Sequence, residues 1–116
     1  MTDRSLGEDL LAVPLEHEPL PADEVDEGSP TTATRELGVL AGAHGVEVGV
    51  WEMTEGTARD TEADEIFIVL SGSGQVRFAD GSVVELSPGV AVRLHAGEQT
   101  TWSITSPLRK VYVAGL

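Results

Sequence analysis

Short apolar stretches, interrupted by turn signals about every ten residues, are the feature that most constrains the fold. Apolar residues alternate with other residues from Val46 to Val50, and the same two-residue period returns in residues 90–94 and 100–104. Asp80-Gly81 is typical of the tight turns that join antiparallel strands. We find no amphipathic helix pattern, so the sequence predicts an all-β sandwich or barrel of about seven or eight short strands.

Four less regular stretches each carry a prediction. The apolar run at residues 66–70 is too short for a helix and predicts a strand buried on both faces. Residues 57–64 are polar and acidic and predict a loop, whereas Ser-Gly-Ser-Gly at residues 71–74 predicts a turn. Ser106-Pro107 is expected to interrupt the chain before a last strand at residues 109–113.

The uneven distribution of apolar residues divides the chain into an arm and a core. Residues 1–35 contain no aromatic side chain and many acids, whereas residues 36–116 hold every aromatic residue. We therefore expect an acidic, proline-rich N-terminal arm over 1–35 and a β-barrel domain over 36–116. Prolines exclude a helix or a central strand over residues 18–32. That segment is either a solvated linker or an arm that adds to a sheet edge or to a partner subunit.

Composition excludes several classes of function. The net charge of −13 argues against binding to nucleic acid or to an anionic membrane, because both require clustered Lys and Arg. Without cysteine there is no disulfide, thiolate metal site or cysteine nucleophile. The longest apolar run is far shorter than the roughly 20 residues of a membrane span, and the N-terminus lacks a signal-peptide pattern. We expect a cytoplasmic protein whose small core favours oligomerisation.

Landmarks in a fixed order resemble the cupin family. Residues 65–72, which begin with Glu and end with Gly, are similar to the end of the first cupin motif. Residues 89–97 are similar to the second motif, with His95 where proline usually stands. With Trp51, Trp102 and the segment 108–112, they resemble small single-domain cupins akin to ureidoglycine aminohydrolase and the ethanolamine-utilisation cupin. The resemblance implies a conical jelly-roll β-barrel of two antiparallel sheets, commonly a homodimer, that can hold a metal and a small polar ligand in its mouth.

The metal site that this resemblance implies is built from two histidines, a glutamate and a third histidine, a set that suits Mn, Fe, Ni or Zn. Glu65 fills the glutamate position. The histidine positions hold other residues, namely Arg59 and Thr61 or Ala58 and Asp60 for the first two, and Thr100 for the third. We therefore predict no conventional metal cofactor, while a divalent metal in a noncanonical site with Glu65 and Asp60 stays an alternative.

The acids of residues 60–65 allow two further interpretations. An oxygen-only site for a hard cation such as Ca²⁺ is one, and a solvated acidic loop is the other; the acids are Asp60, Glu62, Asp64 and Glu65. Glu65 is also a candidate catalytic acid or base if it points into the barrel mouth, where desolvation would raise its pKa. The alternative for Glu65 is a carboxylate paired with Arg77 or Arg93, or exposed at the start of its strand.

Aromatic and polar residues supply the remaining candidates for ligand binding. Trp102 is the best candidate for a stacking wall, because it shares a strand face with Thr100, the inward ligand position. Core packing is the competing interpretation for the aromatic side chains. Other ligand-binding candidates are possible anion partners, a second aromatic residue and a turn histidine, namely Arg59, Arg93, Trp51 and His95.

Three functions are consistent with these residues, and the sequence does not decide whether the protein is an enzyme. The first is a metal-poor or metal-free cupin that binds a small polar metabolite. The second is a cupin enzyme of the aminohydrolase or isomerase type that uses Glu65 as acid or base. The third is a dimeric interaction module that uses its acidic arm.

Overall fold

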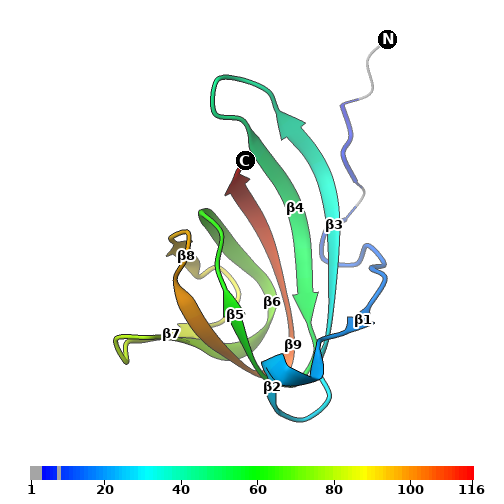
Figure 1. The fold of residues 1–116 in the computed structure, drawn as a ribbon. Coiled ribbons are helices and arrows are strands. Elements are labelled where there is room, and N and C mark those ends of the chain that lie inside the picture. Colours follow the sequence, from blue (N-terminus) through cyan, green and yellow to red (C-terminus); the bar gives the residue numbers. More distant parts are fainter. Residues whose placement is uncertain (1–3, 8) are drawn as a thin grey trace.

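The computed structural model describes residues 4–7 and 9–116, and it contains nine strands and one short 3-10 helix in those residues (Figure 1). No helix among them is long and apolar enough to cross a membrane. In chain order the elements are β1 (Glu18–Pro19), η1 (Ala22–Glu24), β2 (Val25–Glu27), β3 (Thr31–Leu40), β4 (Val46–Met53), β5 (Gly56–Thr61), β6 (Glu65–Phe78), β7 (Val83–Leu86), β8 (Ala91–Leu94) and β9 (Gln99–Gly115).

Two long strands, β6 and β9, run through the whole sheet and give it its curvature. The first half of β9 pairs with β5 and with the end of β6, whereas its second half pairs with β4 and with the start of β6. β6 pairs in addition with β7 and β8, and every ladder is antiparallel. The result is an antiparallel sheet curled into a half-barrel (Figure 1), which confirms the predicted all-β fold.

The bend where β6 crosses β9 corrects two predictions. Residues 71–74 do not form a turn and Ser106-Pro107 does not end a strand, because both stretches stay within continuous strands. The register between the strands shifts at several points between Val69 and Gly74, so the irregular residues are accommodated as bulges. Gly72 has a φ of +91°, and a Cβ there would lie 2.0 Å from the carbonyl oxygen of Pro107. Only glycine therefore fits at this crossing.

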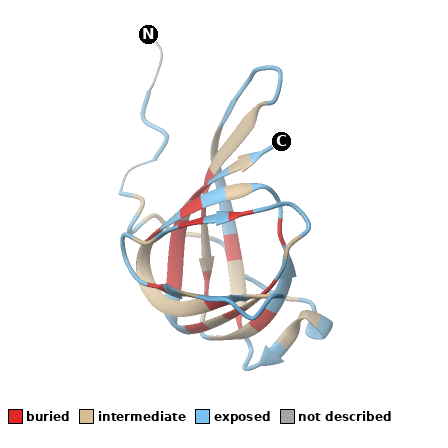
Figure 2. Cartoon of the chain, turned by 90° about the vertical axis from the view of Figure 1, so that its left-hand side faces the viewer, coloured by how far each residue is buried: buried red, intermediate tan, exposed pale blue. Residues whose placement is uncertain are grey.

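The inner face of the curled sheet carries the core (Figure 2). On β6 the inward residues Phe67 and Val69 are buried, but Ile66 and Ile68 on the outer face are 52% and 44% exposed. The prediction of a strand buried on both faces is therefore wrong, because an apolar run does not reveal whether a second layer covers its outer side. Buried core residues are Met53, Ala58, Phe67, Val69, Val76, Leu86, Val92, Leu94, Trp102, Ile104, Leu108 and Tyr112.

Residues 57–64, which were expected to form a loop, instead contain most of β5. This strand lies between β2 and β9. Ala58 faces the core, whereas Arg59, Asp60 and Thr61 at the end of this strand are exposed. The proline-rich segment adds β1 to β3 and β2 to β5. It thus extends two edges of the sheet, one of the two alternatives that the sequence left open.

A buried arginine fastens the N-terminal segment to the outer face of the sheet. Arg109 donates from Nη1 to the carbonyl oxygens of Leu10 and Val13, at 3.1 and 2.7 Å, and from Nε to Glu52 at 2.7 Å. The other oxygen of Glu52 lies 2.7 Å from Nε2 of His17. Burial acts to raise the pKa of Glu52, but its hydrogen bonds to Arg109 and His17 outweigh burial and lower it.

Candidate functional site

Three hydrogen-bonded clusters line the inner face near the open end of the barrel. The first is centred on Glu62, which follows β5. Its Oε2 accepts from the Thr100 hydroxyl at 2.6 Å and from Nε1 of Trp102 at 3.0 Å. Its backbone is also fixed, because its N–H donates to the Glu98 carbonyl and its own carbonyl accepts from Gly97. The Glu62 carboxylate is therefore held in one orientation. The residue is also largely buried, with 9% of its surface exposed.

The second oxygen of the Glu62 carboxylate is not fully enclosed. In the described part of the chain, no enclosed side-chain oxygen or nitrogen lacks a hydrogen-bond partner. The hydrogen bonds of the Glu62 carboxylate all go to Oε2, so Oε1 is not enclosed. A fixed carboxylate with one open oxygen can accept a hydrogen bond from an amide, hydroxyl or ammonium group.

The second cluster is a buried ion pair inside an aromatic box. Lys110 donates from Nζ to Oε2 of Glu65 at 2.7 Å, with side chains that are 5% and 13% exposed. The same nitrogen lies 4.6 Å from the ring centre of Trp51, 4.3 Å from that of Phe67 and 4.8 Å from that of Trp102. Burial of an ammonium is costly unless it is paired, and here one carboxylate and three π faces offset the loss of water.

The rings of the box also contact each other. The Trp51 and Trp102 ring centres are 5.4 Å apart, and those of Phe67 and Trp102 are 5.5 Å apart, with interplanar angles of 51° and 43°. These tilted contacts are favourable arrangements for aromatic pairs. Trp102 belongs to both clusters, since its ring contacts Lys110 while its Nε1 donates to Glu62.

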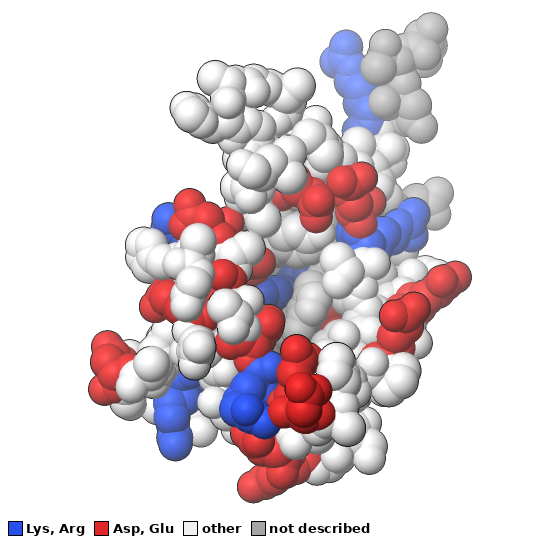
Figure 3. All heavy atoms as spheres, in the orientation of Figure 1, with Lys and Arg blue, Asp and Glu red and all other residues white. Residues whose placement is uncertain are grey.

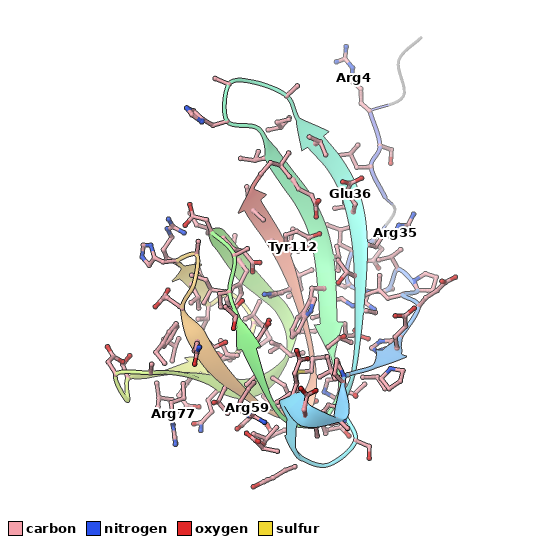
Figure 4. The ribbon with its side chains drawn as sticks, in the orientation of Figure 1. Arg4, Arg35, Glu36, Arg59, Arg77 and Tyr112 are labelled. Carbon is pink, nitrogen blue, oxygen red and sulfur yellow. The ribbon has the colours of Figure 1, made fainter. Side chains whose placement is uncertain are left out.

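The third cluster joins Tyr112 to Glu47. The tyrosine hydroxyl donates to Glu47 Oε2 at 2.6 Å, and its ring lies over Gly49 of β4, where a Cβ would come within 2.4 Å of the hydroxyl oxygen. Burial, the Glu47 hydrogen bond and the nearby carboxylate charges all raise the pKa of Tyr112. The phenol therefore stays protonated and acts as a donor. Figure 4 shows it on β9 beside β4.

Asp60 lies beside these clusters and is largely exposed to solvent. It is the cross-strand partner of Thr100, and the two help to line a cavity of about 390 Å³ with residues of η1 and β6. Partial burial, and then the charges of Glu62 and Glu24, raise the pKa of Asp60 to about 6. Its carboxyl therefore titrates close to neutral pH. Figure 3 shows acidic side chains around a hollow on one face of the molecule.

The structure brings some of the predicted site residues together and leaves others apart. Glu65, Trp102 and Trp51 meet at Lys110, and Thr100 meets Trp102 at Glu62. The remaining three candidates do not contact the side chains of these clusters. The guanidinium of Arg59 binds Asp26 and the Asp23 carbonyl, and Figure 4 shows it near the end of the barrel by β2. Arg93 pairs with Asp64 at 2.7 Å, and exposed His95 begins a turn closed by the Glu98 carboxylate.

The ion pair of Glu65 differs from the alternative considered from sequence. Its carboxylate binds Lys110 rather than Arg77 or Arg93, and Arg93 reaches only its backbone carbonyl, at 3.3 Å. Sequence reasoning missed Lys110, although a signal was present. It is the only lysine of the chain and alternates with buried Leu108 and Tyr112, which places it on the inward face.

The donor set does not fit the transition-metal site implied by the cupin resemblance. The described residues contain no group of three or more His, Asp or Glu side chains arranged to hold a metal. The oxygen-only grouping, one of the two interpretations of these acids, also separates, since Asp64 pairs with Arg93, Glu65 with Lys110 and Glu62 with Thr100. A divalent ion beside Glu65 would in addition meet the positive charge of Lys110.

Comparison with known proteins agrees with the cupin fold. Residues 40–112 match the family model of the EutQ-like cupin domain. The EutQ protein of Clostridium difficile is 27% identical, with a TM-score of 0.69 over 93% of this chain and 84% of that one. A protein of unknown function from Pseudomonas syringae is 22% identical, with a TM-score of 0.74 over 90% of this chain and 45% of that one. Ectoine synthase from P. lautus is 20% identical, with a TM-score of 0.59 over 78% of this chain and 67% of that one. The curated proteins contain no match. The chain belongs to the family of EutQ-like cupin domains.

Proposed function

We propose that this cupin binds a small polar molecule at the open end of its barrel and does so without a transition metal. The observation that carries the proposal is the fixed carboxylate of Glu62, held by Thr100 and Trp102 with one oxygen open. Binding sites of this kind combine an apolar wall with a few oriented polar groups.

The size and chemistry of a cavity lined by Asp60 and by Thr100, the hydrogen-bond partner of Glu62, support a small ligand. The cavity next to Asp60 and Thr100 measures about 390 Å³, within the usual range for small-molecule sites of roughly 300 to 1,000 Å³. Asp60 supplies acceptor oxygens, Arg59 supplies donors and Phe78 an apolar surface. Such a lining suits a molecule with several hydrogen-bonding groups rather than a purely apolar one.

Thermal-shift measurements with a panel of polar metabolites, followed by calorimetry on any hit, test the proposal. We expect at least one compound to raise the melting temperature of the wild-type protein. Thr100→Val removes the hydroxyl that orients Glu62 and should weaken that shift. Thr105→Val is the matched control, because the Thr105 hydroxyl contacts Ser73 away from Glu62. No shift across the panel, or equal binding by both variants, would contradict the proposal.

Elemental mass spectrometry of protein purified without chelator tests the metal-free part separately. We expect Mn, Fe, Ni and Zn all well below one equivalent. Near-stoichiometric metal would reject this part and favour the enzyme alternative, in which Glu65 acts as acid or base beside a metal. Activity that Glu65→Gln abolishes would support that alternative further.

An exposed apolar surface favours a homodimer as well. Ile66 and Val113 are cross-strand partners on the outer face of β6 and β9, and they are 52% and 42% exposed, next to Ile68 at 44%. A contiguous apolar strip on an acidic chain is typical of a surface that associates with a second copy, because two such strips repeat the same contact around a twofold axis.

A further inference from the structure

We infer that the barrel contains a site for a primary ammonium group, that the ammonium of Lys110 fills this site, and that it takes the place beside Glu65 where the cupin resemblance implies a metal. The inference deepens the proposed function, because it identifies the cation that accompanies metal-free binding. It concerns a different part of the barrel from the open oxygen of Glu62.

The site has the geometry that recognises an ammonium ion. The Lys110 nitrogen lies 2.7 Å from a carboxylate oxygen and between 4.3 and 4.8 Å from three ring centres. Cations bind aromatic faces within about 6 Å of the ring centre, and boxes of several rings hold quaternary ammonium ligands in this way. The Glu65 carboxylate adds the charge-assisted hydrogen bond that suits a primary ammonium. Here the box is Trp51, Phe67 and Trp102, contributed by β4, β6 and β9.

Several strands cooperate to place these groups, which marks the box as a built site rather than a chance contact. Lys110 pairs across the sheet with Trp51 of β4, and Trp102 comes from the first half of β9, the strand that also carries Lys110. Trp102 is itself fixed by Glu62. Each wall therefore has support beyond its contact with the lysine.

The same groups disfavour a transition metal at this position. Aromatic carbon atoms surround the cation. A transition metal at this position would instead need imidazole nitrogens or further oxygens as ligands. The Glu65 oxygen that would serve as its ligand already accepts from Lys110. A divalent ion would have to displace an ammonium that is attached to the chain and therefore always present at the site.

If the inference is correct, removing the lysine side chain creates a vacancy for a free alkylammonium ion. Lys110→Ala deletes three methylene groups and the amine, which together have the size and charge of n-propylammonium. We expect this variant to melt well below the wild-type protein, by roughly 10 °C or more, because Glu65 loses its buried partner. Addition of n-propylammonium chloride should recover several degrees of that loss.

The controls separate charge recognition from simple filling of a hole. 1-Propanol has nearly the same shape without the charge, sodium chloride matches the ionic strength, and the wild-type protein has no vacancy. We expect none of these three conditions to reproduce the rescue. If Lys110→Ala is unfolded without ligand, the rescue is measured as gain of far-ultraviolet circular dichroism when n-propylammonium is added. Lys110→Met keeps the volume without the charge, and it should be destabilised but not rescued.

Four outcomes would overturn the inference. They are absence of rescue by n-propylammonium, equal rescue by 1-propanol, wild-type stability in both Lys110 variants, and a specific stabilisation of the wild-type protein by Mn²⁺, Fe²⁺, Ni²⁺ or Zn²⁺. The rescue uses no ligand of the Glu62 region, so its failure leaves the Thr100→Val experiment unaffected. Failure of the metabolite panel likewise leaves the rescue result intact.

Discussion

The coupling between Lys110 and Glu65 can be measured by a double-mutant cycle. Lys110→Met keeps the bulk of the side chain but leaves the buried Glu65 carboxylate without its cation. Breaking one partner of a buried ion pair costs about 3–5 kcal/mol, whereas replacing both partners is often close to neutral. The lysine side chain is only 5% exposed, so solvent offsets little of that cost. We therefore expect Lys110→Met to be strongly destabilised and Lys110→Met with Glu65→Gln to recover most of the loss.

These free energies correspond to a readily measured change in melting temperature. At about 2.1 cal/mol/K per residue, unfolding a chain of 116 residues has an entropy near 0.24 kcal/mol/K at the midpoint. Each kcal/mol then shifts the melting temperature by about 4 °C, so Lys110→Met should melt roughly 12–20 °C below the wild-type protein. The single Glu65→Gln variant should lose less, because the aromatic faces still hold the ammonium.

Urea titration followed by tryptophan fluorescence and by circular dichroism is the appropriate assay. Both tryptophans of the chain, Trp51 and Trp102, are walls of the box, so fluorescence reports on the site while circular dichroism reports on the sheet. Coincident transitions would establish two-state unfolding. A loss below about 1 kcal/mol for Lys110→Met, or strictly additive losses in the double variant, would refute the reasoning.

Three further predictions concern other parts of the barrel. The pKa of Asp60 is about 6 in the folded state and 3.8 ordinarily, so ionisation of this carboxyl opposes folding. Asp60→Asn should therefore melt at a higher temperature than the wild-type protein at pH 7.5. Thermal melts should show this advantage disappearing as the pH falls from about 6 to 4. Ile66→Glu should convert a dimer to a monomer in light scattering without unfolding the chain, and an unchanged mass would argue against an interface there. Arg109→Ala should lower stability by about 3–5 kcal/mol and speed amide hydrogen exchange in residues 10–13, while unchanged exchange would show that other contacts hold this segment.

Local periodicity predicted the parts of the fold that depend on alternation. Thr100 and Trp102 were expected on one strand face with Ile104, and all three are buried on the inner side. The turn at Asp80-Gly81 was predicted from its glycine, which adopts a φ of 88° there. These features are encoded within a few residues, and so a sequence pattern can reveal them.

The missed features depend on contacts between distant residues or on what covers a surface. β5 carries few apolar side chains because much of it faces solvent at the open end, and pairing with β2 and β9 makes it a strand. The sequence predicts that Ile66 is buried, because an apolar run does not show whether a second layer covers the outer face of the strand. Glu62 finds its partners 38 and 40 residues away, beyond the reach of a local pattern.

The location of Trp102 implies that the Glu62 cluster and the aromatic box around Lys110 do not act independently. Its indole N–H orients Glu62, while its ring forms one wall of the box around Lys110. A ligand that binds the open oxygen of Glu62 therefore adjoins a tryptophan whose position is already constrained by an ammonium ion. A shift of the ring large enough to accommodate the ligand would weaken the cation–π contact, whereas a ligand that leaves the ring in place would not. Occupation of the mouth and stability of the buried cation are thus linked through one side chain, and the strength of that link depends on how far a ligand displaces it.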